Sequence, residues 1–387
     1  MTASDTIITL ELGHYRLRER IGGSAYGVIW RAEGPRGTRD VALKLINEAH
    51  MARALPAQRE RWIASAENEI TFLQLLEPWD ERHIVRLLDS GWHNGLPVLA
   101  LELLDCDLGR HMKNLRGRGA TLPLERLLAW TAQLNQALAK VHQYGWRYLD
   151  LNPANVLVDA PLGAVKLADF GTNRRLDAQA EHSYAGTANW QAPEQFFPAG
   201  GGGYATGRRS DYFALGALFY FMATGGTQLR YGGACGQAYR EHHTAGAALL
   251  LRQHGGLPPI LQPDEEALFM QAFAAPAADA ALRLLRHLLA ADPQARPIHA
   301  IDISRQLAAI AGAAGLPGAT PSASPRLPAK AAWEPRSIVA LPATPSAHWW
   351  AAESSGFHSG GPRGNRPHPN PSHTSRLQPD RHSEAEA

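Results

Sequence analysis

The most informative residues of this chain are Asp150-Leu151-Asn152-Pro153-Ala154-Asn155 and, on the next expected hairpin, Asp169-Phe170-Gly171. An Asp and an Asn on one short loop, with a second Asp nearby, are the groups that phosphoryl transfer from magnesium-bound ATP requires. The first Asp accepts the proton of the attacking hydroxyl, and the Asn and the second Asp supply oxygen ligands to Mg²⁺. Asp-x-x-x-x-Asn alone is a weak pattern, but the Asp-Phe-Gly downstream makes two unrelated polar turns the poorer interpretation.

A glycine-containing turn near the N-terminus is a candidate cover for the phosphates. It reads Ile21-Gly22-Gly23-Ser24-Ala25-Tyr26-Gly27-Val28-Ile29 and lies between strand-forming flanks. Gly22 and Gly27 match the outer positions of a Gly-x-Gly-x-x-Gly spacing, with Ser24 in the middle. Glycine lets the backbone approach a phosphate closely. Taken alone, however, the segment favours an ordinary hairpin.

One lysine interrupts an otherwise apolar strand. The segment Val41-Ala42-Leu43-Lys44-Leu45-Ile46 places Lys44 where an unpaired ammonium would be costly to bury. The following helix, expected at 56–76 from its apolar spacing, offers Glu67 and Glu69 as partners. Register favours Glu69, because leucines then follow on adjoining faces of the helix. The alternative is an edge strand with a solvated lysine.

Three further segments complete a family pattern. They are Ala185-Gly186-Thr187-Ala188-Asn189-Trp190-Gln191-Ala192-Pro193-Glu194, Ser210-Asp211-Tyr212-Phe213-Ala214-Leu215-Gly216 and Leu288-Leu289-Ala290-Ala291-Asp292-Pro293-Gln294-Ala295-Arg296-Pro297. With the motifs above, they make residues 15–310 resemble the eukaryotic-like (Hanks-type) serine/threonine protein kinases. The resemblance implies that Asp211 braces the catalytic loop and that Arg296 pairs with Glu194.

The same resemblance implies the fold and the domain limits. We expect an α+β, bilobal protein-kinase-like fold in residues 14–311. The small N-lobe, 14–104, would be β-rich with one large helix, and the larger C-lobe, 105–311, would be mainly helical. Helix signals in the sequence itself predict helices at 124–144 and 279–290. Residues 1–13 would be an N-terminal leader.

The resemblance also assigns roles to the residues already singled out. Asp150 is the expected base, with Asn152 beside it. Asn155 and Asp169 would hold Mg²⁺, and Lys44 with Glu69 would position the phosphates of ATP. The nucleotide would bind against a larger set: Gly22, Ser24, Gly27, Ile29, Ala42, Lys44, Glu102, Leu104, Asp107 and Leu157.

Within that set the resemblance distinguishes three environments. Backbone groups of Glu102 and Leu104 would meet the adenine edge, with Leu101 at the gatekeeper position, and Asp107 would lie near the ribose. Apolar side chains would sandwich the ring from both lobes, and these are Ile29, Ala42 and Leu157. Without the resemblance, the segment around Asp107 is a buried strand that ends in a helix-capping Asp.

Two departures from the family pattern affect the catalytic loop. The His-Arg-Asp triplet of the family is Tyr148-Leu149-Asp150 here, so the arginine that would pair with a phosphorylated activation segment is missing. Asn152 stands where protein Ser/Thr kinases carry Lys. Losing one preorganised donor typically costs about 10²–10³ in rate. Because enzymatic accelerations are far larger, we expect a slowed kinase rather than an inert one.

Two other functions stay open. A pseudokinase scaffold would bind nucleotide or partners without turnover. Small-molecule phosphotransferases share the Asp-x-x-x-x-Asn pattern and often lack the lysine, but they do not normally carry Gly186-Thr187 and Ala192-Pro193-Glu194. A protein substrate with a Ser or Thr acceptor is the better interpretation, with Ser183, Tyr184 and Thr187 as candidate self-modification sites.

Composition bounds the remaining possibilities. The chain has 387 residues, 45% of them hydrophobic, and a net charge of +2, which gives no electrostatic case for nucleic acid. Its 2 cysteines, Cys106 and Cys235, exclude a disulfide framework and are compatible with the cytoplasm. We expect neither a signal peptide in 1–13 nor a membrane span.

The C-terminal part, residues 312–387, is rich in Pro, Ser, Ala, Gly and His and has no hydrophobic period. Such a composition cannot bury enough apolar surface to order itself, so we expect a disordered tail. Trp349-Trp350 is either a chance pair or a motif that docks a partner, and the composition favours the chance pair.

Overall fold

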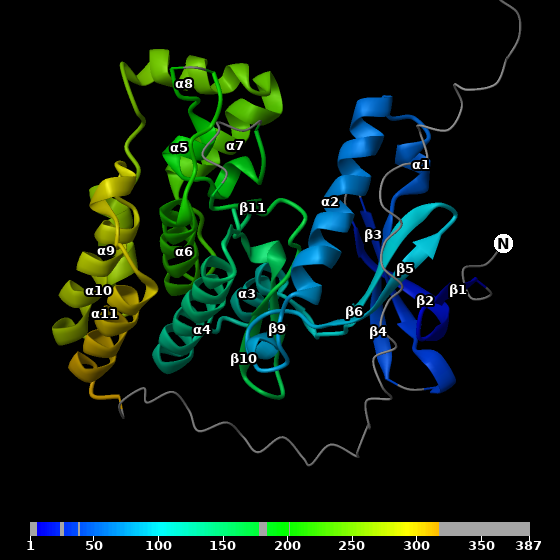
Figure 1. The fold of residues 1–387 in the computed structure, drawn as a ribbon. Helices are drawn as coiled ribbons and strands as arrows, with labels where there is room; N and C mark the ends of the chain where they lie inside the picture. The colour runs from blue at the N-terminus through cyan, green and yellow to red at the C-terminus, as the bar shows by residue number, and fades with distance from the viewer. Residues whose placement is uncertain (1–5, 24–26, 38, 178–183, 201, 317–387) are drawn as a thin grey trace, which may run out of the picture. The chain divides into compact units, whose positions relative to one another are not determined.

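The structure is a computed structural model, and it describes residues 6–23, 27–37, 39–177, 184–200 and 202–316. A β-sheet with one long helix is followed along the chain by a mainly helical region (Figure 1). This is the predicted α+β arrangement. Ser24, Ser183 and Trp349-Trp350 lie outside the described residues.

The N-terminal sheet is six-stranded and antiparallel, with the order β1-β2-β3-β4-β6-β5. Its strands are β1 (Ile7–Leu10), β2 (Gly13–Gly23), β3 (Gly27–Glu33), β4 (Asp40–Ile46), β5 (Leu87–His93) and β6 (Leu96–Glu102). Lys44 lies on β4, between β3 and β6. It is therefore on an interior strand, and the alternative of an edge strand was wrong.

The first strand corrects the predicted leader. β1 pairs with β2, so that Ile8 lies opposite Tyr15, and Ile8 and Leu10 are buried. Alternate residues of β1 are buried and exposed, as in a strand with one face on a core. The sheet therefore begins at Ile7, before the predicted boundary at residue 14.

The long helix of this lobe is α2 (Pro56–Gln74), which confirms the helix expected at 56–76. Pro56 occupies its first turn, where the missing N–H costs nothing. The helix buries Glu69, Phe72 and Leu73. The short helix α1 (Glu48–Met51) precedes it, and Asn47 caps that helix through His50 N–H.

The helical region contains most of the remaining elements. Its helices are α3 (Leu108–Gly117), α4 (Leu124–Gln143), α5 (Pro193–Phe196), α6 (Arg208–Ala223), α7 (Arg230–His242), α8 (Ala245–His254), α9 (Pro263–Met270), α10 (Ala275–Leu288) and α11 (Ala300–Ala313). Its short strands are β7 (Cys106–Asp107), β8 (Trp146–Arg147), β9 (Val156–Asp159), β10 (Ala164–Leu167) and β11 (Arg174–Arg175). Single 3₁₀ turns are η2 (Pro35–Gly37), η3 (Asp80–Arg82), η4 (Pro153–Asn155), η5 (Ala188–Trp190) and η6 (Pro293–Ala295). None of the described helices is both long and apolar enough to cross a bilayer.

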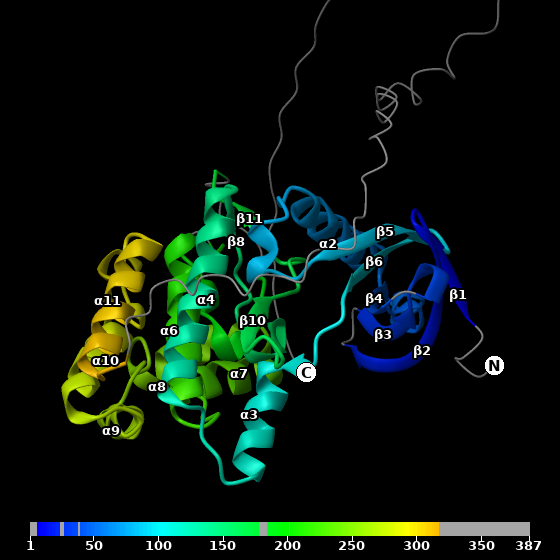
Figure 2. The same ribbon diagram turned by 90° about the horizontal axis from the view of Figure 1, so that it is seen from below.

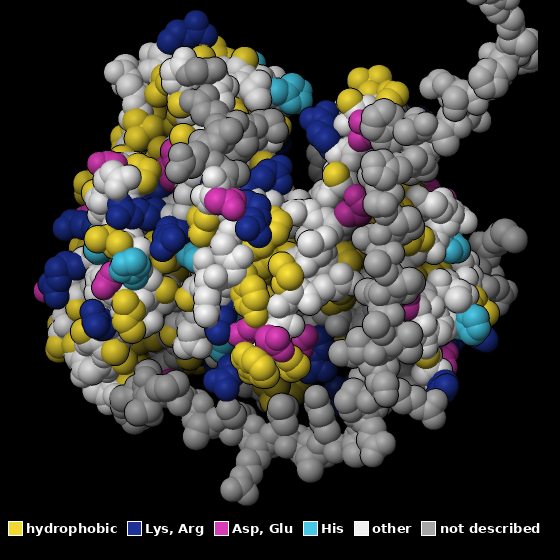
Figure 3. Space-filling view, viewed as in Figure 1, with side chains coloured by type: hydrophobic (Ala, Val, Ile, Leu, Met, Phe, Trp, Pro, Cys, Tyr) yellow, Lys and Arg dark blue, Asp and Glu magenta, His cyan; other side chains and the backbone are white. Residues whose placement is uncertain are grey.

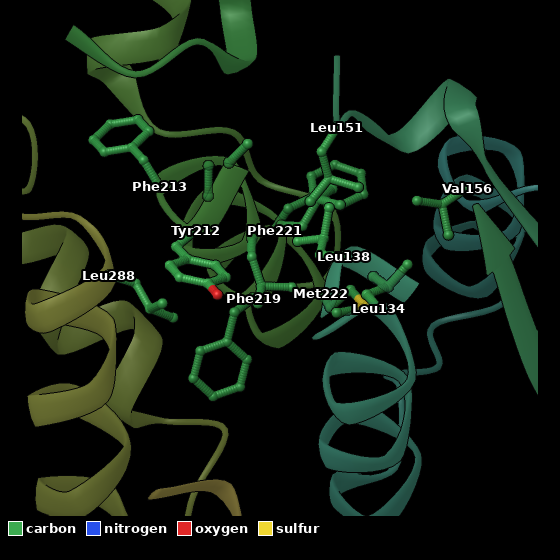
Figure 4. Close-up of a cluster of buried hydrophobic side chains, with 14 of the residues drawn as sticks. Leu134, Leu138, Leu151, Val156, Tyr212, Phe213, Phe219, Phe221, Met222 and Leu288 are labelled. Atoms are coloured by element: carbon green, nitrogen blue, oxygen red, sulfur yellow. The ribbon is translucent and has the colours of Figure 1, made fainter. Parts of the chain in front are cut away.

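Helix α6 is the centre of the helical region. It lies beside α4 in both ribbon views (Figures 1 and 2), and 13 of its 16 residues are buried. Its aromatic side chains belong to the same buried cluster as leucines of α4 and α10 and as Leu151 and Val156, which flank the 3₁₀ turn η4 (Figure 4). The hydrophobic core therefore lies beneath the loop that carries Asp150 and supports it.

The surface carries charges of both signs. On the face drawn in Figure 3, basic and acidic side chains are interspersed over the helical region rather than gathered by sign. This mixture agrees with a net charge of only +2.

Candidate active site

One buried carboxylate holds the loop that carries Asp150. Asp211, at the start of α6 and 1% exposed, accepts hydrogen bonds from the backbone N–H groups of Tyr148 (2.9 Å) and Leu149 (2.7 Å). His142 Nε2 lies 2.7 Å from the same carboxylate. Leu149 has a φ of 68°, which a residue with a Cβ rarely adopts, so the backbone here needs an external partner. Asp211 is the brace that the resemblance implied.

Asp150 receives three side-chain hydrogen bonds. Its donors are Asn152 Nδ2 at 3.1 Å, Asn155 Nδ2 at 3.0 Å and Thr187 Oγ1 at 2.8 Å. Burial and the nearby charge of Asp169 raise the pKa of Asp150 to about 6, and the three donors act in the opposite direction. The carboxylate is thus ionised at neutral pH and is basic enough to accept a proton.

Lys44 links the two lobes through two ion pairs. Its Nζ lies 2.6 Å from Glu69 Oε2 on α2 and 2.9 Å from Asp169 Oδ1. Glu69 is 1% exposed, whereas Glu67 is exposed, so the structure selects the partner that register favoured. Burial acts to lower the pKa of Lys44, but Asp169 and Glu69 more than compensate, and the ammonium stays charged.

Asn155 and Asp169 fit the requirements of a magnesium site. Asn155 turns its amide nitrogen toward Asp150, which leaves its oxygen for a cation. Its backbone carbonyl accepts the N–H of Ala168, so Asp169 follows directly beside it. Partial burial acts to raise the pKa of Asp169, but the charge and hydrogen bond of Lys44 outweigh it and lower the pKa.

A magnesium ion at this site would need few protein ligands. In the part of the chain that the structure describes, no group of three or more His, Cys, Asp and Glu side chains could hold a metal. Magnesium in ATP-dependent enzymes needs only one or two carboxylates, because the substrate phosphates complete its shell.

Helix α2 contacts the Asp-Phe-Gly segment along one face. Ser65 Oγ donates to the Gly171 carbonyl at 2.9 Å, and Asn68 Nδ2 donates to the Asn173 carbonyl at 3.2 Å. Further along the helix, Phe72 stacks on Phe170 with a ring-centroid distance of 4.6 Å. Tyr148 meets Phe170 edge-on at 5.2 Å. These contacts place Glu69 opposite Lys44, and the aromatic ring at position 148 packs on Phe170.

Strand register brings the predicted nucleotide residues together in pairs. Ile29 lies opposite Lys44, Ala42 opposite Leu101, and Leu157 opposite Asp107. Asp107 caps α3, because its Oδ1 accepts the Arg110 N–H at 2.8 Å, which confirms the capping role and leaves its ribose role a prediction.

Glu102 and Leu104, the two residues expected to meet the adenine edge, lie in different surroundings. The Glu102 side chain binds Lys166 and the Arg86 N–H, and its own N–H donates to the Arg86 carbonyl. Only the Glu102 carbonyl is therefore a candidate for the adenine edge. Leu104 lies on the half-buried segment that follows β6.

An ion pair anchors the segment from Ala185 to Glu194, which the resemblance implies is the end of the activation segment. Arg296, whose side chain is fully buried, makes a two-point contact with Glu194 at 2.7 and 2.9 Å, as the resemblance implied. Ser210 Oγ donates to the same carboxylate at 2.7 Å. Gly186 has a φ of 96°, and a Cβ there would lie 2.7 Å from the Leu149 carbonyl. The segment therefore runs directly against the catalytic loop.

The sequence did not single out several contributors to the site. Gly23, rather than Gly22, has the φ that requires glycine (153°), and a Cβ there would meet the Gly27 carbonyl at 2.9 Å. Ser65 and Asn68 were also missed. Their helical spacing with Phe72 was the available signal, but an α2 face carrying both polar and apolar side chains is ambiguous without its partner.

The fold and the arrangement of the site are those expected of a protein kinase, and a family comparison agrees. Residues 15–304 match the family described as protein kinase domain, and the chain belongs to this family.

Two curated relatives are similar to part of the chain. The chain is 30% identical over 244 residues to the serine/threonine-protein kinase PkaA of Streptomyces coelicolor, a match that covers 60% of this chain and 42% of the relative. It is 25% identical over 214 residues to a probable serine/threonine-protein kinase of Clostridium perfringens, CPE1738, covering 54% and 29%. These matches thus span less than half the length of either relative.

Proposed function

We propose that this chain is a serine/threonine protein kinase that transfers the γ-phosphate of magnesium-bound ATP to hydroxyl groups of proteins, itself included. The main support is the convergence of one ammonium, two carboxylates and two amides from separate segments. Lys44 contacts Asp169, Asn155 contacts Asp150, and Asn152 lies between Asp150 and Thr187. The named relatives, both serine/threonine kinases by name, add support.

The proposed mechanism uses each of these groups. The substrate oxygen bonds to the γ-phosphorus, the bond from that phosphorus to the β–γ bridging oxygen breaks to release ADP, and the proton passes to Asp150. Lys44, fixed by Glu69, positions the phosphates. Magnesium, when held by Asn155 and Asp169, supplies positive charge to the phosphates. Thr187, which donates to Asp150, favours a Ser or Thr acceptor.

A catalytically inert scaffold is the second candidate, and Asn152 is the observation that favours it. Its Nδ2 donates to Asp150 and its Oδ1 accepts the Ala154 N–H at 2.9 Å, so the side chain is engaged within its own loop. It brings no positive charge to the phosphate. A missing donor of this kind typically costs about 10²–10³ in rate, far less than the whole acceleration of an enzyme. We therefore keep the kinase as the first proposal.

Two further assignments are proposals of the same kind. Free Cys106 and Cys235 agree with a reaction in the cytoplasm. The ion pair between Glu194 and Arg296 disfavours a small-molecule acceptor, because small-molecule phosphotransferases do not normally carry the segment that contains Glu194.

The deciding experiment separates nucleotide binding from transfer. The purified full chain is incubated with radiolabelled ATP, Mg²⁺ and a cell lysate, and phosphorylated proteins are identified by mass spectrometry. We expect labelled Ser and Thr in the wild type and none with Asp150→Asn, although both bind magnesium-ATP in calorimetry. Asp279→Asn, exposed on α10, is the matched control. Binding without transfer in the wild type would establish the scaffold instead.

A further inference from the structure

Thr187 is held on Asp150 although the family's phosphate-binding arginine is absent. Leu149 stands at that position and is 3% exposed, so it offers no charge to a phosphorylated residue. Nevertheless, Thr187 Oγ1 lies 2.8 Å from Asp150 Oδ1. Another part of the molecule must fix this end of the activation segment, and α7 contacts it on both sides of Thr187. The sequence assigned no role to α7.

The first contact is an aromatic stack just before Gly186. The ring of Tyr184 lies parallel to Tyr239 of α7, with centroids 4.5 Å apart and an interplanar angle of 15°. Tyr204, 5% exposed, meets the same ring edge-on at 5.6 Å. Such aromatic pairs stabilise a fold by more than the burial of their apolar area alone would. Tyr184 is thus held on two sides.

The hydroxyl of Tyr184 contributes nothing to this anchor. It is buried and has no hydrogen-bond partner within the described residues. Its burial also argues against Tyr184 as a self-modification site in this conformation, because a phosphate there would have to enter the stack.

The second contact lies just after Thr187. Asn189 packs against two glycines of α7, and an added Cβ would meet Asn189 O at 2.1 Å from Gly232 and Asn189 Oδ1 at 2.0 Å from Gly236. Gln228 Nε2 also donates to the Asn189 carbonyl at 2.9 Å. Only residues without a side chain permit this approach. Gly233 on the same helix faces open space.

We propose that α7 clamps the activation segment at Tyr184 and Asn189, and thereby holds Thr187 on Asp150 without a phosphate on the segment. Tyr184, Tyr239, Gly232 and Gly236 are positioning residues in this proposal. The inference rests on the proposed kinase activity, and it adds how the same site is ordered.

The first test compares two substitutions of Tyr184 in the full chain, after phosphatase treatment. Tyr184→Phe keeps the ring and removes only the unpartnered hydroxyl, so kcat should stay at the wild-type value. Tyr184→Ala removes the stack, and kcat for the protein substrate should fall on the order of 10²-fold, as displaced catalytic groups typically cause. KM for magnesium-ATP should stay unchanged, because the ring contacts of Tyr184 involve neither Lys44 nor Asp169. An equal loss in both variants, or a full loss on phosphatase treatment, would overturn the proposal.

The second test uses the glycines of α7. Gly236→Ala should lower kcat as Tyr184→Ala does, whereas Gly233→Ala should not, since its Cβ meets nothing within 4 Å. Thermal unfolding and magnesium-ATP affinity, measured on every variant, identify any that fails to fold. Equal kcat values for Gly236→Ala and Gly233→Ala would contradict the clamp.

Hydrogen exchange separates this inference from the proposed function. Amides of Tyr184 to Trp190 should exchange faster in Tyr184→Ala and Gly236→Ala than in Tyr184→Phe and Gly233→Ala. If the wild type transfers no phosphate, the proposed function fails, and this exchange pattern still decides whether α7 holds the segment. Uniform exchange in all four variants would overturn the clamp alone.

Discussion

At the scale of single residues, the chemistry depends on how Asp150 is surrounded. Burial and Asp169 raise its pKa, whereas Asn152, Asn155 and Thr187 stabilise its ionised form. The balance leaves a carboxylate that is stronger as a base than a solvated Asp. The same donors also orient the carboxylate, because the loop that carries each donor holds it in place.

The pKa of Asp150 predicts an acid limit to activity. The carboxylate accepts a proton only when ionised, so kcat/KM should fall as pH drops below about 6. Steady-state rates from pH 5 to 8, with magnesium-ATP binding measured in parallel, provide the measurement. A flat kcat/KM across pH 6 would contradict the assignment of Asp150 as the base.

Asn152→Asp offers a sharper test at the same position. The new carboxylate keeps the oxygen that accepts the Ala154 N–H but replaces the donor 3.1 Å from Asp150 Oδ1 with a like charge. The pKa of Asp150 should rise, so the acid limit should move to higher pH. Asn114→Asp, exposed on α3, is the control and should leave the profile unchanged. An unmoved limit in Asn152→Asp would show that the two side chains do not interact.

At the scale of elements, polar contacts in the interior decide how segments meet. Helix α2 reaches the Asp-Phe-Gly segment through Ser65 and Asn68, and α6 reaches the catalytic loop through Asp211. Arg296 joins the segment before α11 to α5 and also donates to the backbone carbonyls of Ala290 and Ala291. The contacts from α2, from Asp211 and between Arg296 and Glu194 link residues far apart in the chain, so each of these depends on the completed fold.

The chain offers a matched pair of arginine–glutamate contacts that differ in burial. Arg296 is 0% exposed and Arg286 is 56% exposed, and each makes two hydrogen bonds with its glutamate. Arg296→Ala leaves Glu194 unpaired and should lower the free energy of unfolding by about 3–5 kcal/mol. Arg286→Ala should lower it by less than about 1 kcal/mol. Urea denaturation measures both, and similar losses would refute a buried anchor at Arg296.

At the scale of the whole molecule, Lys44 links the sheet to the helical region. It lies on β4, bonds to Glu69 of α2 and reaches Asp169 beyond β10. The position of the Lys44 ammonium therefore depends on both lobes. The hydrophobic cores of the described residues lie between Ile8 and Ala311.

Those cores predict the effect of removing the C-terminal segment. A chain that ends at Leu316 should unfold within about 2 °C of the full chain, because a change of 1 kcal/mol shifts Tm by about 2–4 °C in domains of about 150–250 residues and by less in larger ones. Scanning calorimetry on both chains measures the shift. A larger drop in Tm would show that residues 317–387 pack on the kinase domain.

The sequence by itself determined the family, the α+β order of elements and the partners set by local register. Lys44 and Glu69 could be paired because strand and helix periodicities fix which side chains share a face. Asp107 could be identified as a cap because it stands between an expected strand and the following helix, where the Asp carboxylate can accept a backbone N–H. The limits of α2 and α4 followed from apolar spacing, and the start of α10 was missed because Pro276 permits an earlier first turn.

Only the tertiary structure decided the contacts between distant segments. β1 joins the sheet by pairing with β2, although 1–13 has no motif that marks it. The pKa of Asp150 depends on burial and on Asp169, and the stack of Tyr184 on Tyr239 depends on where α7 lies. Such contacts have no periodic signature in the sequence, because the residues meet only after the loops between them close.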